Sequence, residues 1–253
     1  MPGEPAFEMV LEGDLDDALV VGMAELGVGG LTTVDYCATN MESTPIGHVR
    51  SRNLPDLTPF SDGVPRQPMR LYSLDGTGVS VLVSEVFLPV WVAEPLADAL
   101  IETATDQGVE EITVLNGSQF PHRESEHAVY HVATDEYRDR HFGGEDPELP
   151  PMAGGFFDGV ISELLVRGLE GEAPSVGVLV TPTHPPGPDL DAALRFLDAL
   201  ETIYGLEVDE TELRERAAET KRYYEELAQR MQALREEETP YLGRDFPEDR
   251  MYM

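Results

Sequence analysis

Apolar residues gather in short runs along the first 208 positions, and turn residues separate the runs. Such runs predict buried strands at 17–22, 44–49, 69–74, 79–85, 111–115, 128–134 and 175–181. Apolar positions spaced three to four residues apart predict helices at 31–41, 95–107, 156–167 and 189–204. The turn Asp75-Gly76 indicates a hairpin, and Asp189 is placed to cap the helix that follows it. Strands that alternate with helices are typical of an α/β sandwich around a mostly parallel sheet.

The longest periodic segment covers residues 209–238 and predicts an amphipathic helix. Asp209 and Glu212 have the spacing of a capping box at its start. Its apolar positions step by four and three residues in turn and form a heptad seam: Leu213, Ala217, Thr220, Tyr224, Leu227, Met231 and Leu234. A seam of this kind docks one helix on another. It therefore forms either an oligomer interface or a packing surface on the chain's own domain.

The pattern divides the chain into three parts. Residues 1–208 are expected to form the α/β domain, and residues 209–238 the long helix. Residues 239–253 contain two prolines and several acidic residues, a composition that predicts a flexible tail.

The charge of the chain is unusual. Seventeen basic residues oppose 49 acidic ones, which gives a formal net charge of −32, and Lys221 is the sole lysine. Such a surface repels nucleic acid and anionic lipid, because both carry phosphate. Molar salt shortens the screening length to about 3 Å, so the carboxylates then tolerate one another. Acidic excess with little lysine favours a protein from a halophilic archaeon.

Other features of the sequence favour a cytoplasmic protein. No stretch approaches the roughly 20 apolar residues of a membrane helix, and the N-terminus lacks the pattern of a secretory signal. Cys37 is the single cysteine, which excludes an internal disulfide. It lies on an apolar helix face, so we interpret it as a small buried residue and not as a reactive thiolate.

A glycine-rich segment follows the first strand and precedes a helix, as nucleotide-binding loops do. Gly22 to Gly30 (GMAELGVGG) nevertheless departs from the dinucleotide fingerprint, because the third glycine required falls on Thr32. We interpret this segment as a tight turn with close packing between strand and helix.

Histidines gather in one polar stretch, at His122, His127, His131 and His141. On a strand, His127 and His131 would lie about 13 Å apart, too far to share a metal ion. Ser118 lacks the nucleophile elbow, and Asp189 with Asp191 suits helix capping better than acid–base catalysis. The residues therefore predict no catalytic, cofactor or metal site.

The chain ends on a hydrophobic residue, a tyrosine and one further residue, Met251, Tyr252 and Met253. Proteins that activate the proteasome dock an ending of this form between α-subunits of the core particle. The residue types suit such docking. A terminal carboxylate can pair with a lysine, and a phenol joins apolar area to one hydrogen bond. The alternative is a frayed terminus.

Several short motifs follow one another over about residues 15–237. They are Ala18-Leu-Val-Val-Gly22 with Gly27 to Gly30, Glu110 to Asn116, Val132-Ala-Thr-Asp135, Gly154-Gly155 with Gly159, Pro188-Asp189 with Ala192-Ala193, and Gly205-Leu-Glu-Val-Asp209. In this order they resemble the archaeal proteasome assembly chaperone family, relatives of the eukaryotic assembly chaperones.

The resemblance implies a three-layer, phosphorylase/hydrolase-like α/β sandwich with no established catalysis. It also implies a homo-oligomer that presents its tails to the α-subunits of the core proteasome, with Met251, Tyr252 and Met253 matching the docking ending. We therefore expect a chaperone or proteasome-binding factor without a cofactor. Two alternatives stay open: a small-molecule or nucleotide-binding enzyme on the same fold, and an oligomer built around the long helix.

Overall fold

The computed structural model describes residues 6–54, 56–123, 126–144, 148–184 and 187–238. The chain forms two compact units that meet in sequence between Glu210 and Thr211. The first unit holds the sheet and its helices, and the second holds the long helix α6 (Thr211–Glu238).

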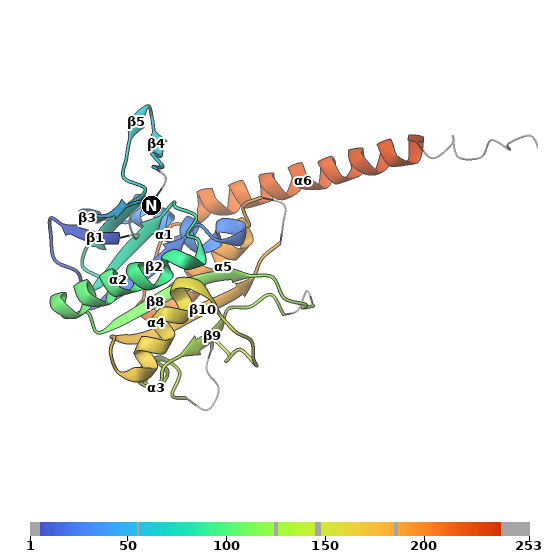
Figure 1. Ribbon diagram of the computed structural model, residues 1–253. Coiled ribbons are helices and arrows are strands. Elements are labelled where there is room, and N and C mark those ends of the chain that lie inside the picture. Colours follow the sequence, from blue (N-terminus) through green and yellow to red (C-terminus); the bar gives the residue numbers. More distant parts are fainter. Residues whose placement is uncertain (1–5, 55, 124–125, 145–147, 185–186, 239–253) are drawn as a thin grey trace, which may run out of the picture. The chain divides into compact units, whose positions relative to one another are not determined.

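The first unit is built on an eight-stranded sheet in the order β1-β3-β6-β7-β2-β8-β10-β9 (Figure 1). In chain order the strands are β1 (Ala6–Leu11), β2 (Ala18–Met23), β3 (Ser43–Arg52), β6 (Met69–Leu74), β7 (Val79–Ser84), β8 (Glu111–Ser118), β9 (Tyr130–Ala133) and β10 (Ser175–Pro182). Two short strands, β4 (Phe60–Ser61) and β5 (Val64–Pro65), form a separate hairpin.

The four central strands β7, β2, β8 and β10 run parallel to one another. β2, β7 and β10 are buried along their whole length, as expected for parallel strands covered on both faces. Antiparallel strands extend this centre at both edges, with β6, β3 and β1 on one side and β9 on the other. The predicted α/β fold around a parallel sheet is confirmed, and β6 with β7 forms the predicted hairpin.

Helices cover both faces of the sheet. They are α1 (Gly29–Asn40), α2 (Ala93–Gln107), α3 (Asp135–His141), α4 (Gly159–Glu170) and α5 (Leu190–Tyr204), with 3-10 turns η1 (Leu26–Val28) and η2 (Val90–Val92). α2 and α4 pack on one face, and α1 and α5 on the other (Figure 1). This arrangement makes three layers, as the family resemblance implies.

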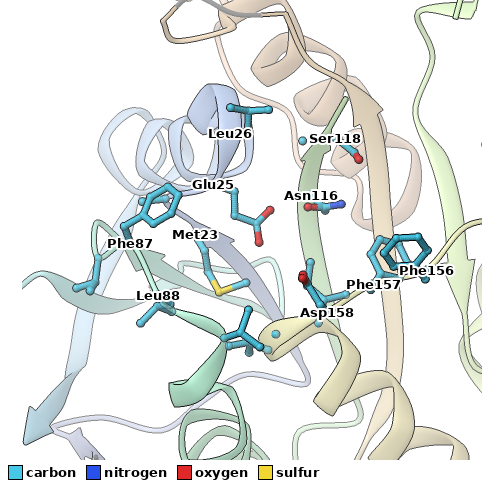
Figure 2. Close-up of a pocket in the computed structure, with 17 residues that line it drawn as sticks. Met23, Glu25, Leu26, Phe87, Leu88, Asn116, Ser118, Phe156, Phe157 and Asp158 are labelled. Carbon is cyan, nitrogen blue, oxygen red and sulfur yellow. The ribbon is translucent and has the colours of Figure 1, made fainter. Parts of the chain in front are cut away.

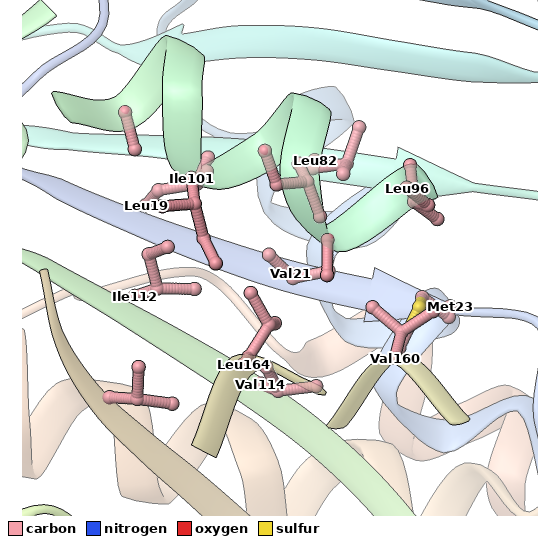
Figure 3. Packing of buried hydrophobic residues seen from close by; sticks show 14 of the residues in the cluster. Leu19, Val21, Met23, Leu82, Leu96, Ile101, Ile112, Val114, Val160 and Leu164 are labelled. Atoms are coloured by element: carbon pink, nitrogen blue, oxygen red, sulfur yellow. The ribbon is translucent and has the colours of Figure 1, made fainter. Parts of the chain in front are cut away.

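The main core lies between the sheet and the α2/α4 layer (Figure 3). Leu19 and Val21 of β2 and Ile112 of β8 point into it, where they meet Leu96 of α2 and Leu164 of α4. Each of these five side chains is at most 1% exposed. Alternate residues of the same strands face the opposite layer, so the sheet is buried on both sides.

Close packing explains the glycines between β2 and α1. A Cβ atom on Gly22 would overlap the carbonyl oxygen of Gly30, and one on Gly30 would overlap the carbonyl oxygen of Leu115. Glycine at these positions lets α1 lie directly against β2 and β8. The interpretation of this segment as a tightly packed turn is confirmed.

Four helix starts differ from the sequence prediction. α1 and α2 each begin two residues earlier than expected, at Gly29 and Ala93. α4 begins at Gly159 and not at Phe156, because Asp158 has extended backbone angles and serves as the N-cap. α6 begins at Thr211, two residues after the expected start at Asp209. The predicted cap of α5 is confirmed, since a side-chain oxygen of Asp189 accepts a hydrogen bond of 2.9 Å from the backbone N–H of Ala192.

Candidate functional site

The loops that leave the carboxyl ends of β2 and β7 diverge. The chain after β2 passes into α1 on one face of the sheet, and the chain after β7 passes into α2 on the other. In parallel sheets a crevice opens where neighbouring strands send their connections to opposite faces, and ligands bind there. We therefore expect a ligand-binding crevice at the edge of the sheet formed by the carboxyl ends of β7, β2 and β8.

A crevice of about 360 Å³ lies at this edge (Figure 2). Its walls come from the ends of β2 and β8, from the loops after β2 and β7, and from the segment that leads into α4: Met23 to Leu26, Val86 to Leu88, Val90, Asn116 to Ser118 and Phe156 to Ile161. Small-molecule sites in proteins occupy about 300–1,000 Å³. The crevice is therefore large enough for a small metabolite or for one or two side chains of a partner.

Two carboxyl groups face the crevice (Figure 2). Atom Oε2 of Glu25 is shielded from water and has no hydrogen-bond partner in the described part of the chain. Burial, together with the negative charge of Asp158, raises the pKa of Glu25 to about 7. A carboxyl of this kind carries a proton near neutral pH and can donate it or bind a cationic group.

Apolar side chains surround these carboxyl groups. Phe156 is 93% exposed and Phe87 is 75% exposed, and both line the crevice together with Leu26 and Val90. Large exposed apolar patches mark ligand-binding grooves or protein–protein contacts. An acidic floor with an apolar rim suits a ligand or side chain that joins a positive group to hydrocarbon.

A second polar cluster lies at the opposite edge of the sheet, where β8 begins. Glu111 is 3% exposed, and its carboxylate contacts the guanidinium of Arg140 and Nε2 of His141. Burial raises the pKa of Glu111, but hydrogen bonds from His141, Tyr204 and Arg140 outweigh it and hold the pKa below its usual range. All of these groups are paired with one another, so we interpret the cluster as a structural support for α3 and not as a catalytic site.

Comparison with known proteins identifies the family. The sequence model of the PAC2 family matches residues 19–228. The chain belongs to the PAC2 family. Among curated proteins none matches this chain in sequence.

Solved structures share the fold of this chain. PbaA from Pyrococcus furiosus, described as an archaeal homolog of proteasome-assembly chaperone, has a TM-score of 0.77 at 19% identity and covers 92% of this chain and 95% of its own. PbaB from the same organism, described as an archaeal proteasome activator, has a TM-score of 0.73 at 21% identity, covering 90% of this chain and 100% of its own. A proteasome-assembly chaperone homologue from Mycobacterium tuberculosis has a TM-score of 0.54 at 16% identity, and it covers 83% of this chain and 94% of its own. At these identities the likeness shows the fold.

The histidines of this PAC2-family chain are arranged differently from the grouping weighed in the sequence. His131 is buried, stacks on Phe142 at 3.9 Å between ring centroids, and is held by the carbonyl oxygen of Leu149. His122 and His127 instead come together with His184, which lies outside the polar stretch that holds the other histidines. Cys37 is buried, and burial raises its pKa to about 12, as expected for a packing residue.

The predicted partner-binding residues all belong to the second unit. The seam residues Leu213, Ala217, Thr220, Tyr224, Leu227, Met231 and Leu234 all lie on α6. Leu213 and Ala217 are buried, whereas Leu227 and Met231 are 38% and 51% exposed. Met251, Tyr252 and Met253 lie outside the described residues. No helix in the described part of the chain is long and apolar enough to cross a membrane.

Sequence reasoning missed the crevice at the sheet edge. Glu25, Asn116 and Asp158 are far apart along the chain, and no sequence motif assigns a ligand to any of them. The available signal was positional: Glu25 and Asn116 belong to the segments where buried strands end. The carboxyl ends of parallel strands meet at one edge, so polar residues at those places can be grouped in advance.

Proposed function

We propose that this protein is a non-catalytic proteasome assembly chaperone or proteasome-binding factor, acting in the cytoplasm as a homo-oligomer. The observation that carries the proposal is the likeness of nearly the whole chain to PbaA and PbaB, whose descriptions name a proteasome-assembly chaperone homolog and a proteasome activator. Membership of the PAC2 family over residues 19–228 supports it independently.

In this proposal the three parts of the chain have separate tasks. Residues 1–208 form the α/β body, residues 209–238 the spacer, and residues 239–253 the docking tail. The 28 residues of α6 span about 42 Å at 1.5 Å per residue. Met251, Tyr252 and Met253 then dock between α-subunits of the core proteasome, where the terminal carboxylate pairs with a cationic side chain and the tyrosine ring enters an apolar slot.

The apolar seam supports the oligomer part of the proposal. Leu227 and Met231 are exposed on α6, and exposed heptad positions are stabilised when a second copy covers them. Several tails on one oligomer would engage several pockets of the same α-ring. Linked binding of this kind strengthens the overall affinity about 10²- to 10⁴-fold when the linkers span the pockets.

The test compares binding of four versions of the chain to core proteasome from the same organism. They are the full-length protein, a version that ends at Arg250, Tyr252→Ala and Met253→Ala. Binding is measured in molar KCl, because a net charge of −32 supports adaptation to high salt. We expect the truncation and Tyr252→Ala to lose binding at least tenfold.

Met253→Ala is the matched control, because the docking ending accepts any last residue and this variant should retain binding. Equal binding by the full-length and truncated versions would refute the tail mechanism. A further assay separates the two tasks within the proposal. An assembly chaperone speeds formation of α-rings from free α-subunits, whereas an activator raises peptide hydrolysis by finished core particles.

The crevice favours a second candidate function, the binding of a small molecule, with or without a reaction. The specific observation is the shielded carboxyl of Glu25 beside Asp158 in a space of ligand size. We expect compounds with an amine or guanidinium joined to an apolar group to raise the melting temperature of the full-length protein but not of Glu25→Gln. If neither protein responds to a panel of such compounds, this candidate is rejected and the proteasome proposal is unaffected.

A further inference from the structure

Three histidine side chains converge beyond the carboxyl ends of β8 and β10. His122 follows β8, His127 precedes β9, and His184 follows β10. Nε2 of His122 lies 2.9 Å from Nε2 of His127 and 3.0 Å from Nε2 of His184. One ligand atom from each ring falls within 4.8 Å of the others. Three ring nitrogens therefore point toward one small volume.

The hydrogen-bond partners of the Nδ1 atoms show where the ring protons of His122 and His184 lie. Nδ1 of His122 lies 2.7 Å from the carbonyl oxygen of Phe120, which only accepts hydrogen bonds. Nδ1 of His184 lies 3.1 Å from a carboxylate oxygen of Asp189, also an acceptor. Both Nδ1 atoms therefore carry the ring proton, and in a neutral imidazole the Nε2 atom then presents a lone pair.

The close contact between Nε2 of His122 and Nε2 of His184 therefore requires a cation. Two lone pairs on Nε2 of His122 and His184 lie 3.0 Å apart, and neither nitrogen can donate to the other. A proton placed between them would satisfy these two rings, but Nε2 of His127 lies only 2.9 Å from Nε2 of His122 and would remain as a third nitrogen in the same space. A metal ion accepts all three lone pairs at once.

We propose that His122, His127 and His184 form a binding site for a divalent transition-metal ion, with Zn²⁺ as the ion that fits best. Imidazole nitrogen is a preferred ligand of Zn²⁺, and sites with three protein ligands keep a fourth position for water. His127 and His184 are exposed, so water can reach that position.

The surroundings have the features of a supported metal site. Ligating histidines usually donate their other N–H to a carboxylate or a backbone carbonyl, which orients the ring and raises its basicity. Asp189 and the carbonyl of Phe120 supply these two kinds of partner here. Asp189 also caps α5, so the metal would connect the segments after β8 and β10 to the start of that helix.

The test uses full-length protein without an affinity tag, freed of metal by a chelator and kept in molar KCl to suppress weak binding by surface carboxylates. Zn²⁺ is titrated calorimetrically, and Co²⁺ is followed by the visible absorption of tetrahedral coordination. We expect one ion per chain, a melting temperature that rises with Zn²⁺, and at least tenfold weaker binding in His184→Ala. His48→Ala, on β3 and outside the cluster, is the matched control and should bind like the wild type.

Asp189→Asn tests the supporting carboxylate separately. Asparagine caps helices about as well as aspartate, so α5 should persist, while loss of the carboxylate should weaken Zn²⁺ binding about 10- to 100-fold. The proposal is overturned if His122→Ala and His184→Ala, with unchanged circular dichroism, bind Zn²⁺ as the wild type does. It is also overturned if the wild type gives no tetrahedral Co²⁺ spectrum.

Discussion

Replacing Glu25 by glutamine should stabilise the protein, and the gain should depend on pH. The pKa of Glu25 is raised from 4.5 to about 7 because the carboxyl is buried and lies near Asp158. The folded state therefore binds the proton of Glu25 more tightly than the unfolded state does. Below about pH 4.5 both states are protonated and nothing is lost, whereas above pH 7 ionisation favours the unfolded state.

The size of the effect follows from the shift. At about 1.4 kcal/mol per pKa unit, a rise from 4.5 to about 7 costs the folded state about 3 kcal/mol above pH 7. Glu25→Gln removes that charge, although its amide brings its own cost of burial, about 1 kcal/mol. We therefore expect a gain of about 2 kcal/mol in the free energy of unfolding at pH 8, and little or no gain at pH 4.5.

The assay is urea unfolding in molar KCl, followed by far-UV circular dichroism at both pH values. Glu102→Gln, at an exposed position on α2, is the matched control because it removes one negative charge from the surface. Comparing the two variants cancels the general repulsion among the acidic residues. An equal effect of Glu25→Gln and Glu102→Gln at pH 8 would refute the reasoning that burial holds Glu25 protonated.

Two further predictions concern the polar and packed groups around α3. A Cβ atom on Gly177 would overlap the ring of Tyr137, so Gly177→Ala should cost about 1–3 kcal/mol in urea unfolding, whereas Gly144→Ala, with open space around it, should change little. Glu111→Gln should cost about 1–3 kcal/mol at pH 7. Because hydrogen bonds such as that from His141 lower the pKa of Glu111, its contribution is present above the usual carboxyl pKa and fades as the pH falls. The difference in the free energy of unfolding between wild type and Glu111→Gln, measured with urea, should therefore be smaller at pH 3 than at pH 7. A difference of the same size at both pH values would contradict this.

The fold was predictable where burial leaves a local mark. β2 and β10 are covered on both faces, so they appear as continuous apolar runs, and α5 shows its cap at Asp189 directly in the sequence. β1 was not predicted from the sequence, because it lies at an edge of the sheet and is only partly buried, so its residues form no such run. The start of α4 was placed too early because Phe156 continues the apolar spacing although the chain there lines the crevice.

The sequence by itself determined the layered α/β architecture, the long C-terminal helix and the strongly acidic surface, because each depends on residues that are neighbours along the chain or on simple counts. Only the tertiary structure decided which distant side chains meet. The sheet order brings Glu25 and Asn116 to one crevice with Asp158, and carries His184 to His122. Contacts of this kind depend on strand order and crossover direction, which no local periodicity encodes.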